Sequence, residues 1–150
     1  MLVKVKKLNE NAVIPEYAKP GDAGLDLTAT SREIDDNGNI VYGTGLAFEI
    51  PYGYVGLLFP RSSVSKKSIY LTNCVGVLDS GYRGEVMFKF KPASCMDKNN
   101  TSFLETAPHM YEVGERIGQL IILPYPSIKL VESDELSSTE RGDGGFGSTN

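Results

Sequence analysis

The sequence predicts an all-β protein whose strands form a β-barrel or jelly-roll-like fold. Short runs with period-two alternation, or with β-branched and aromatic residues, recur along the chain. Clusters of Gly, Pro, Asn and Asp separate these runs, and no long segment has the i, i+3, i+4, i+7 apolar spacing of an amphipathic helix. The α/β nucleotide-binding folds are therefore disfavoured.

The expected strands are, in chain order, 2–8, 46–50, 54–59, 69–71, 85–90, 118–123 and 128–131. The first alternates apolar and basic side chains, and the later ones are rich in aliphatic, β-branched and aromatic residues. Turn signals stand between them at 19–22, 36–39, 51–53 and 79–81. Residues 62–67 can form one or two helical turns.

The length of 150 residues suits one domain. We expect a β core over 1–131 and a flexible C-terminal tail over 132–150, because apolar content falls sharply after Val131 and glycines gather near the end. The polar, mixed segment 93–110 predicts a long loop or surface excursion.

Composition and charge narrow the function classes. A formal net charge of −4 argues against direct nucleic-acid binding, which usually needs a basic surface. There is neither a leader-like apolar run nor a stretch of about 18 apolar residues, so no membrane association is expected and cytoplasmic residence is the default, or host cytoplasm or nucleus for a viral protein. Cys74 and Cys95 are expected to be reduced thiols, and a single histidine, His109, argues against a zinc site.

Three arginines, Arg61, Arg116 and Arg141, are candidates for phosphate binding, because they neighbour small hydroxyl or amide side chains. Taken singly, such residues are more often surface or salt-bridging arginines. Ser62 and Ser63, which follow Arg61, fit an anion site at a helix start and a simple capped short helix equally well.

The C-terminal segment RGDGGFGST allows two interpretations. Its four glycines and the isolated Phe146 fit a lid that stacks a ring on a base, whereas composition alone fits a disordered Gly-rich end. It is not a P-loop, because the lysine of that motif is absent.

The segment 72–86 is the most informative one. An apolar strand leads into Asp79-Ser80-Gly81, and after Tyr82 a second strand begins, so a β-hairpin is expected. The backbone at the mouth of such a hairpin can read the polar edge of a pyrimidine, and Tyr82 can wall off a sugar. Asp79 would then be either a general base for water or a turn-capping residue.

Together these segments resemble the five ordered motifs of trimeric dUTPases: AGLDL at 23–27, PRSSVS at 60–65, GVLDSGYRGEV at 76–86, GERIGQLII at 114–122 and RGDGGFGSTN at 141–150. The segment TGLAFEIPYGYVG at 44–56 is also similar to that family. The resemblance spans most of the chain, and 30–42 and 93–110 match least.

The resemblance implies a homotrimer in which each active site is assembled from neighbouring chains and closed by a C-terminal tail. It also implies hydrolysis of dUTP to dUMP and pyrophosphate, which limits uracil incorporation into DNA and supplies dUMP for dTMP synthesis. Mg²⁺ would be held mainly by the triphosphate and its waters.

Carried over by position, the resemblance assigns roles to individual residues. Asp79 would activate the water that attacks the α-phosphorus, and Tyr82 would pack under the deoxyribose and exclude a 2′-hydroxyl. Uracil would be read by Asn73, Gly76 and Val77, and the phosphates would be held by Arg61, Ser62, Ser63 and Gln119. Asp26 would support the metal through water, and the tail would close with Arg141, Gly145, Phe146 and Ser148. Arg116 either joins the phosphate site or pairs structurally within the trimer.

Some positions depart from the commonest family pattern: Ser63 stands for a frequent Gly, Gly81 for a frequent Asp, and Asp143 adds a carboxylate to the tail motif. Two competing interpretations remain. A dCTP deaminase, similar in fold, needs a glutamate on the strand after the hairpin, about where this chain has Lys89. A regulatory module would keep the nucleotide pocket and bind a partner.

Overall fold

The computed structural model describes residues 1–93 and 109–145. Within these residues the chain forms ten β-strands and one short 3₁₀ helix, and no α-helix, so the all-β prediction is confirmed. The elements are β1 (Lys4–Lys7), β2 (Leu25–Thr28), β3 (Ser31–Ile34), β4 (Ile40–Gly43), β5 (Leu46–Glu49), β6 (Tyr54–Pro60), η1 (Ser62–Lys66), β7 (Ile69–Leu71), β8 (Gly76–Leu78), β9 (Met87–Pro92) and β10 (Arg116–Pro124).

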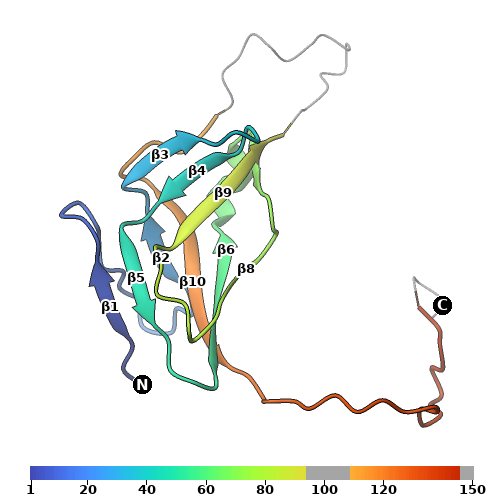
Figure 1. The fold of residues 1–150 in the computed structure, drawn as a ribbon. Helices are drawn as coiled ribbons and strands as arrows, with labels where there is room; N and C mark the ends of the chain where they lie inside the picture. Colours follow the sequence, from blue (N-terminus) through green and yellow to red (C-terminus); the bar gives the residue numbers. More distant parts are fainter. Residues whose placement is uncertain (94–108, 146–150) are drawn as a thin grey trace, which may run out of the picture.

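Two four-stranded antiparallel sheets make up the body (Figure 1). Their strand orders are β2-β10-β6-β8 and β3-β4-β9-β7, and a separate ribbon pairs β1 with β5. β10 is central to the first sheet: it pairs with β6 from Gly118↔Pro60 to Pro124↔Tyr54, and with β2 on its other edge. Most neighbours in these sheets are far apart in sequence, as in a jelly-roll-like fold.

The core lies between the two sheets. Phe88 and Phe90 alternate with exposed residues along β9, and Ile117 and Leu120 are fully buried on β10. The sheets approach so closely that a Cβ added to Gly118 would collide with the Phe88 ring. Glycine at this position therefore permits the contact between the sheets.

The aromatic side of the core is held by specific contacts. The Tyr42 and Phe90 rings meet edge to face, with centroids 5.8 Å apart. The Tyr42 hydroxyl donates a hydrogen bond of 2.8 Å to the Tyr111 carbonyl oxygen. This bond fixes the segment that precedes β10 against β4.

Several strand predictions need correction. β2, β3 and β4 were not expected, because each is only four residues long and lies in the poorly patterned region between turn signals. The expected strand at 128–131 does not form: these residues are exposed, with Ile128 74% accessible, and no strand among the described residues pairs with them. The expected strand at 85–90 is shifted to Met87–Pro92.

The segment 72–86 is not a β-hairpin. β8 pairs with β6 in one sheet, whereas β9 pairs with β4 and β7 in the other. The strands on either side of the Asp79–Tyr82 turn therefore belong to different sheets, because each buries its apolar side chains against a different partner.

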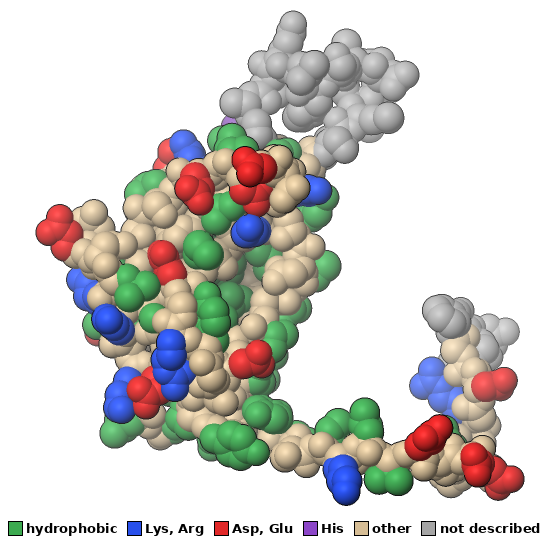
Figure 2. All heavy atoms as spheres, viewed as in Figure 1, with side chains coloured by type: hydrophobic (Ala, Val, Ile, Leu, Met, Phe, Trp, Pro, Cys, Tyr) green, Lys and Arg blue, Asp and Glu red, His purple; other side chains and the backbone are tan. Residues whose placement is uncertain are grey.

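After β10 the chain leaves the body. The backbone N–H of Tyr125 still donates to the Gly53 carbonyl oxygen at 3.0 Å, and residues 126–145 then extend away with most side chains exposed (Figure 1). Figure 2 shows acidic and basic side chains distributed along this arm. None of the described helical segments is long and apolar enough to cross a membrane.

Candidate functional site

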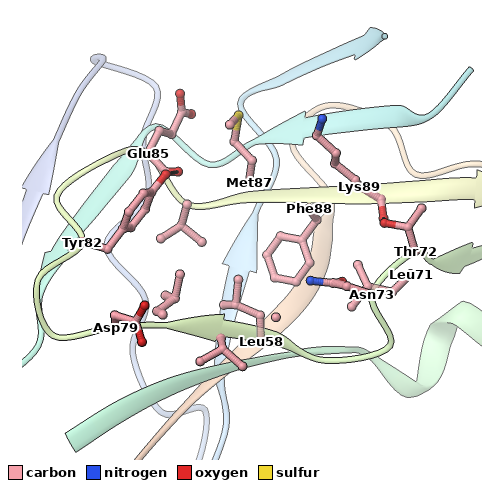
Figure 3. Close-up of a pocket in the computed structure, with 14 residues that line it drawn as sticks. Leu58, Leu71, Thr72, Asn73, Asp79, Tyr82, Glu85, Met87, Phe88 and Lys89 are labelled. Atoms are coloured by element: carbon pink, nitrogen blue, oxygen red, sulfur yellow. Dashed lines mark hydrogen bonds between the residues drawn. The ribbon is translucent and has the colours of Figure 1, made fainter. Parts of the chain in front are cut away.

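A pocket of about 340 Å³ opens where β8 and β9 diverge into their separate sheets (Figure 3). Its walls come from β6, from the β7–β8 connection, from β8, from the 79–86 loop and from the start of β9. The lining residues are Leu58, Leu71, Thr72, Asn73, Gly76, Val77, Leu78, Asp79, Tyr82, Glu85, Val86, Met87, Phe88 and Lys89. The size and the mixed lining suit a small organic ligand.

Two strand edges face this pocket. β8 pairs with β6 alone, through Gly56↔Leu78, Leu57↔Val77 and Leu58↔Gly76, so its other edge has no strand partner among the described residues. On β9, β7 covers the backbone only from Phe90 onward, which leaves Met87 and Phe88 open on that side. Backbone N–H and C=O groups on such edges can pair with the polar rim of a planar ring.

Gly76 is required for the floor of the pocket. It is buried on β8, and a Cβ there would lie 3.0 Å from the Leu58 Cβ. A larger residue would push β8 away from β6 or narrow the opening. The neighbouring Val77 also lines the pocket, and its side chain is exposed.

Asn73 lies at one end of the pocket. It stands in the tight connection between β7 and β8, where Cys74 has a positive φ of 58° and its N–H donates to the Leu71 carbonyl oxygen at 3.2 Å. Figure 3 shows the Asn73 side chain directed into the pocket. The structure thus brings Asn73, Gly76 and Val77 together as expected from the sequence.

Asp79 and Tyr82 lie on the loop at the other end. The Tyr82 N–H donates to the Asp79 carbonyl oxygen at 3.0 Å, which closes the turn, and the Tyr82 hydroxyl donates to the Glu85 carbonyl oxygen at 3.0 Å. The Asp79 carboxylate accepts no hydrogen bond from the described part of the chain and is exposed. It therefore does not cap its own turn, and it is free to meet a ligand or water.

A second pocket, of about 410 Å³, lies beside β2 and β10. It contains Arg61, Arg116, Asp26 and Gln119, together with Glu16 and Asp22. Asp26 is bridged by both arginines: Arg61 Nε donates to its Oδ1 at 2.7 Å, and Arg116 Nη1 donates to its Oδ2 at 3.0 Å. Arg116 thus makes an ion pair inside its own chain.

Gln119 is positioned by its neighbours in the same pocket. Its Nε2 donates to the Pro60 carbonyl oxygen at 3.2 Å, and its side-chain amide occupies the space that a Cβ on Gly24 would need. The AGLDL segment therefore contributes both a carboxylate and the room for Gln119. Arg61 remains about one quarter accessible, so its guanidinium can reach a ligand.

Ser62 and Ser63 begin the η1 helix but line neither pocket. The Ser63 hydroxyl lies 3.1 Å from the Tyr111 hydroxyl, and the Ser62 carbonyl oxygen accepts from Ser65 Oγ at 2.8 Å. Arg61 is the N-cap residue and makes no side-chain cap. The structure does not join these serines to Asn73 and Asp79.

Arg141 and Gly145, the described tail candidates, line neither pocket in this chain. Arg141 Nε donates to the Gly144 carbonyl oxygen at 2.9 Å within its own turn, and Gly145 is the last described residue. Phe146 and Ser148 lie outside the described residues, as do Cys95 and most of the 93–110 excursion.

The two pockets share no lining residue and differ in their charged groups. The first has Lys89 as its only cationic lining residue, whereas the second has two arginines. Lys89 is itself paired, because its Nζ donates to Asp35 Oδ2 at 3.1 Å. A ligand with a ring and several phosphates would need features of both pockets.

Other lining residues were not found from the sequence. In the first pocket these are Thr72, Glu85 and Met87, and in the second they are Glu16 and Asp22. Thr72 and Glu85 lie within the segment 72–86, and Asp22 lies within the turn signal at 19–22, but no motif assigned a role to these positions. Among the described residues, no group of three or more His, Cys, Asp or Glu side chains is arranged to hold a metal ion.

The chain is similar to known proteins along nearly its whole length. The family model for dUTPase matches residues 10–150. A deoxyuridine 5′-triphosphate nucleotidohydrolase from Hydrogenobaculum sp. is 40% identical over 152 residues, which covers 99% of this chain and 98% of the relative. The enzyme of the same name from Alkaliphilus metalliredigens is 37% identical over 149 residues, with 98% and 96% covered.

Solved structures agree with these matches. A mutant dUTPase of Staphylococcus bacteriophage 80alpha, with dUpNHpp, superimposes with a TM-score of 0.79 at 34% identity, over 98% of this chain and 97% of the phage chain. Another structure of the 80alpha dUTPase with the same nucleotide analogue also has a TM-score of 0.79 at 34% identity, over 99% and 98% of the two chains.

Proposed function

This chain belongs to the dUTPase family, and on that premise we propose that it hydrolyses dUTP to dUMP and pyrophosphate in the pocket between β8 and β9. It is an enzyme of the dUTP diphosphatase class, as its relatives are by name. The observation that carries the site assignment is that Asp79, Tyr82 and Asn73 line one pocket with two open strand edges.

The pocket suits uracil and deoxyribose. A uracil ring inserted beside Gly76 and Val77 would form hydrogen bonds with the β8 backbone, as an additional strand would. The Asn73 side chain would form a further hydrogen bond with the ring. The Tyr82 ring flanks the same space and would pack under the sugar, where a ribose 2′-hydroxyl would meet its face instead of water (Figure 3).

Asp79 would act on the water that attacks the α-phosphorus. Its carboxylate is on the pocket rim and has no partner in the described part of the chain. A carboxylate in this position can accept a proton from water while orienting the oxygen for in-line attack. The bond from the α-phosphorus to the bridging oxygen then breaks, and pyrophosphate leaves.

The phosphates require more positive charge than the first pocket offers, because Lys89, its only cationic lining residue, is already paired with Asp35. Arg61 and Gln119 lie in the second pocket, with Ser62 and Ser63 following Arg61. A homotrimer would resolve this separation, because the arginine-containing pocket of one chain could meet the nucleoside pocket of another. The C-terminal tail would then close over phosphate and base through Arg141, Gly145, Phe146 and Ser148.

Mg²⁺ is the metal that fits this chemistry. When bound to the triphosphate, it would neutralise charge on the phosphate oxygens. The second pocket offers carboxylate and amide oxygens, the ligand type that Mg²⁺ prefers. Both oxygens of Asp26 are already paired with arginines, which suits an indirect role through water.

The test is pyrophosphate release by the full chain with Mg²⁺, comparing dUTP with dCTP, dTTP and UTP while ammonia is followed from dCTP. Release from dUTP alone is expected, since base and sugar are both read. Ammonia from dCTP would move the chain to the deaminases. Tight dUTP binding without any turnover would instead indicate a regulatory nucleotide-binding module.

A further inference from the structure

The loop that carries Asp79 and Tyr82 is attached to the body at its C-terminal end by a compact set of hydrogen bonds. The Val86 N–H donates to the Leu46 carbonyl oxygen at 2.8 Å, and the Val86 carbonyl oxygen accepts from the Thr44 hydroxyl at 2.7 Å and from the Thr44 N–H at 3.3 Å. Thr44 is fully buried, and its hydroxyl is satisfied by this bond. The turn between β4 and β5 is thus a fixed anchor for this loop.

Glu85 adds a charged hydrogen bond to this anchor. Its Oε1 accepts the Gly45 N–H at 2.7 Å, a bond between a carboxylate and a backbone donor, which is stronger than a neutral one. Gly45 has a positive φ of 66°, and a Cβ there would meet Asn9 and Ala12. Glycine at this position therefore lets the turn direct its N–H to the carboxylate.

The same residue also holds Tyr82. The Tyr82 hydroxyl donates to the Glu85 carbonyl oxygen at 3.0 Å, so the ring is tied to the residue whose side chain is anchored on Gly45. The ring also lies over Gly84, where a Cβ would collide with the tyrosine hydroxyl. Tyr82 is 44% exposed, so more than half of its surface is covered.

We infer that Glu85 is a positioning residue for Tyr82, and that its bond to the β4–β5 turn sets how strictly the pocket distinguishes deoxyribose from ribose. The inference rests on the proposed function, because it assigns Tyr82 to the sugar. Without the carboxylate, residues 82–85 lose a fixed point, and the ring can move aside to admit a 2′-hydroxyl. The base-reading edge of β8 lies opposite its pairing with β6, and Glu85 takes no part in that pairing, so this edge is unaffected.

The test compares Glu85→Ala with Glu85→Gln, measuring kcat/KM for dUTP and for UTP. The amide oxygen of glutamine can still accept the Gly45 N–H, so Glu85→Gln should keep the dUTP:UTP ratio within about twofold. Glu85→Ala should lower that ratio by about tenfold, since small misplacements at a reacting site have large kinetic effects. Glu49→Ala, which removes an exposed carboxylate paired with Lys4, is the matched control and should leave the ratio unchanged.

A structural role alone would lower activity on both nucleotides equally and leave the ratio as in the wild type. That result for Glu85→Ala would overturn the inference. In a Tyr82→Ala background, removing Glu85 should have no further effect on the ratio, because its influence passes through the ring. A further tenfold fall in that background would contradict this route.

Tyr82→Phe is a second, milder variant that keeps the ring and removes only its bond to Glu85. It should relax the ratio in the same direction as Glu85→Ala, and an unchanged ratio would overturn the inference even if Glu85→Ala did not fold. Relative affinities for dUDP and UDP, measured by calorimetry, should follow the same order. A wild-type protein without dUTP turnover would instead contradict the proposed function, which these ratios do not test.

Discussion

At the scale of single residues, Asp79 is the side chain on which turnover should depend most. Its carboxylate has no partner in the described residues and lines the pocket, so replacing it changes little in the folded chain. We expect Asp79→Asn to bind dUTP with about the wild-type affinity and to lose about a hundredfold or more in kcat, as for removal of a positioned base. Equilibrium binding and single-turnover kinetics would measure the two effects separately.

Asp143→Asn is a useful comparison for this variant, because it removes a carboxylate from the tail motif and leaves the pocket intact. A wild-type rate for Asp79→Asn would show that another group activates the water. Asp26 differs from Asp79 in that both oxygens of its carboxylate form ion pairs with arginines.

At the scale of elements, the turn between β3 and β4 should give the protein a pH-dependent contribution to stability. The Asn39 side-chain amide, its backbone N–H and Lys89 hold the pKa of the Asp35 carboxyl well below its ordinary value of 3.8. A carboxyl with a lowered folded-state pKa stabilises the fold above its unfolded pKa, and that contribution is lost as pH falls towards the folded value.

Asp35→Asn should therefore be less stable than the wild type at pH 7, and the difference should shrink as pH falls from about 5 to about 2. Urea denaturation across this range would measure it. Asp36→Asn, at the adjacent exposed position of the same turn, is the control and should show no such trend. A constant difference for Asp35→Asn at all pH values would point to packing instead of charge.

The C-terminal arm is the second element with a testable role. The hydrogen bonds of residues 141–145 in the described chain stay within residues 139–144, so deleting 141–150 should leave the thermal unfolding temperature nearly unchanged. Hydrolysis should fall by about a hundredfold, because the site is then not closed. A protein that no longer folds after this deletion would show that the segment is structural.

At the scale of the whole molecule, the nucleoside pocket and the arginine-containing pocket are separate within one chain, so the proposed site would be complete only between copies of the chain. Asp79 and Tyr82 line one pocket and Arg61 lines the other, with no shared residue. If copies of the chain complete each other, Asp79→Asn and Arg61→Gln should be inactive alone and should regain activity when unfolded together and refolded as mixed trimers.

A one-to-one mixture should recover about one quarter of the wild-type rate, because a productive site needs Asp79 from one chain and Arg61 from its neighbour, each present with a chance of one half. Each variant refolded alone is the control. No recovery from a mixture that does form trimers would mean that both groups act from the same chain.

The sequence by itself determined the all-β class, the positions of most long strands and the grouping of Asn73, Gly76, Val77, Asp79 and Tyr82. These features depend on local alternation, on turn residues and on short motifs, and each of these signals involves residues that are close together in the sequence. The strands β2, β3 and β4 escaped because they lie in a poorly patterned region between turn signals, whereas β5 and β7 are no longer and were expected.

Only the tertiary structure decided that β8 and β9 lie in different sheets. The pocket lies between these two strands, where a hairpin would have paired them. The tertiary structure also paired Asp26 with Arg61 and Arg116, across 35 and 90 positions, and Glu85 with Gly45 across 40. Such contacts form when each strand buries its apolar side against the partner that the whole sheet offers. The local sequence around either residue does not contain that partner, so it cannot specify the contact.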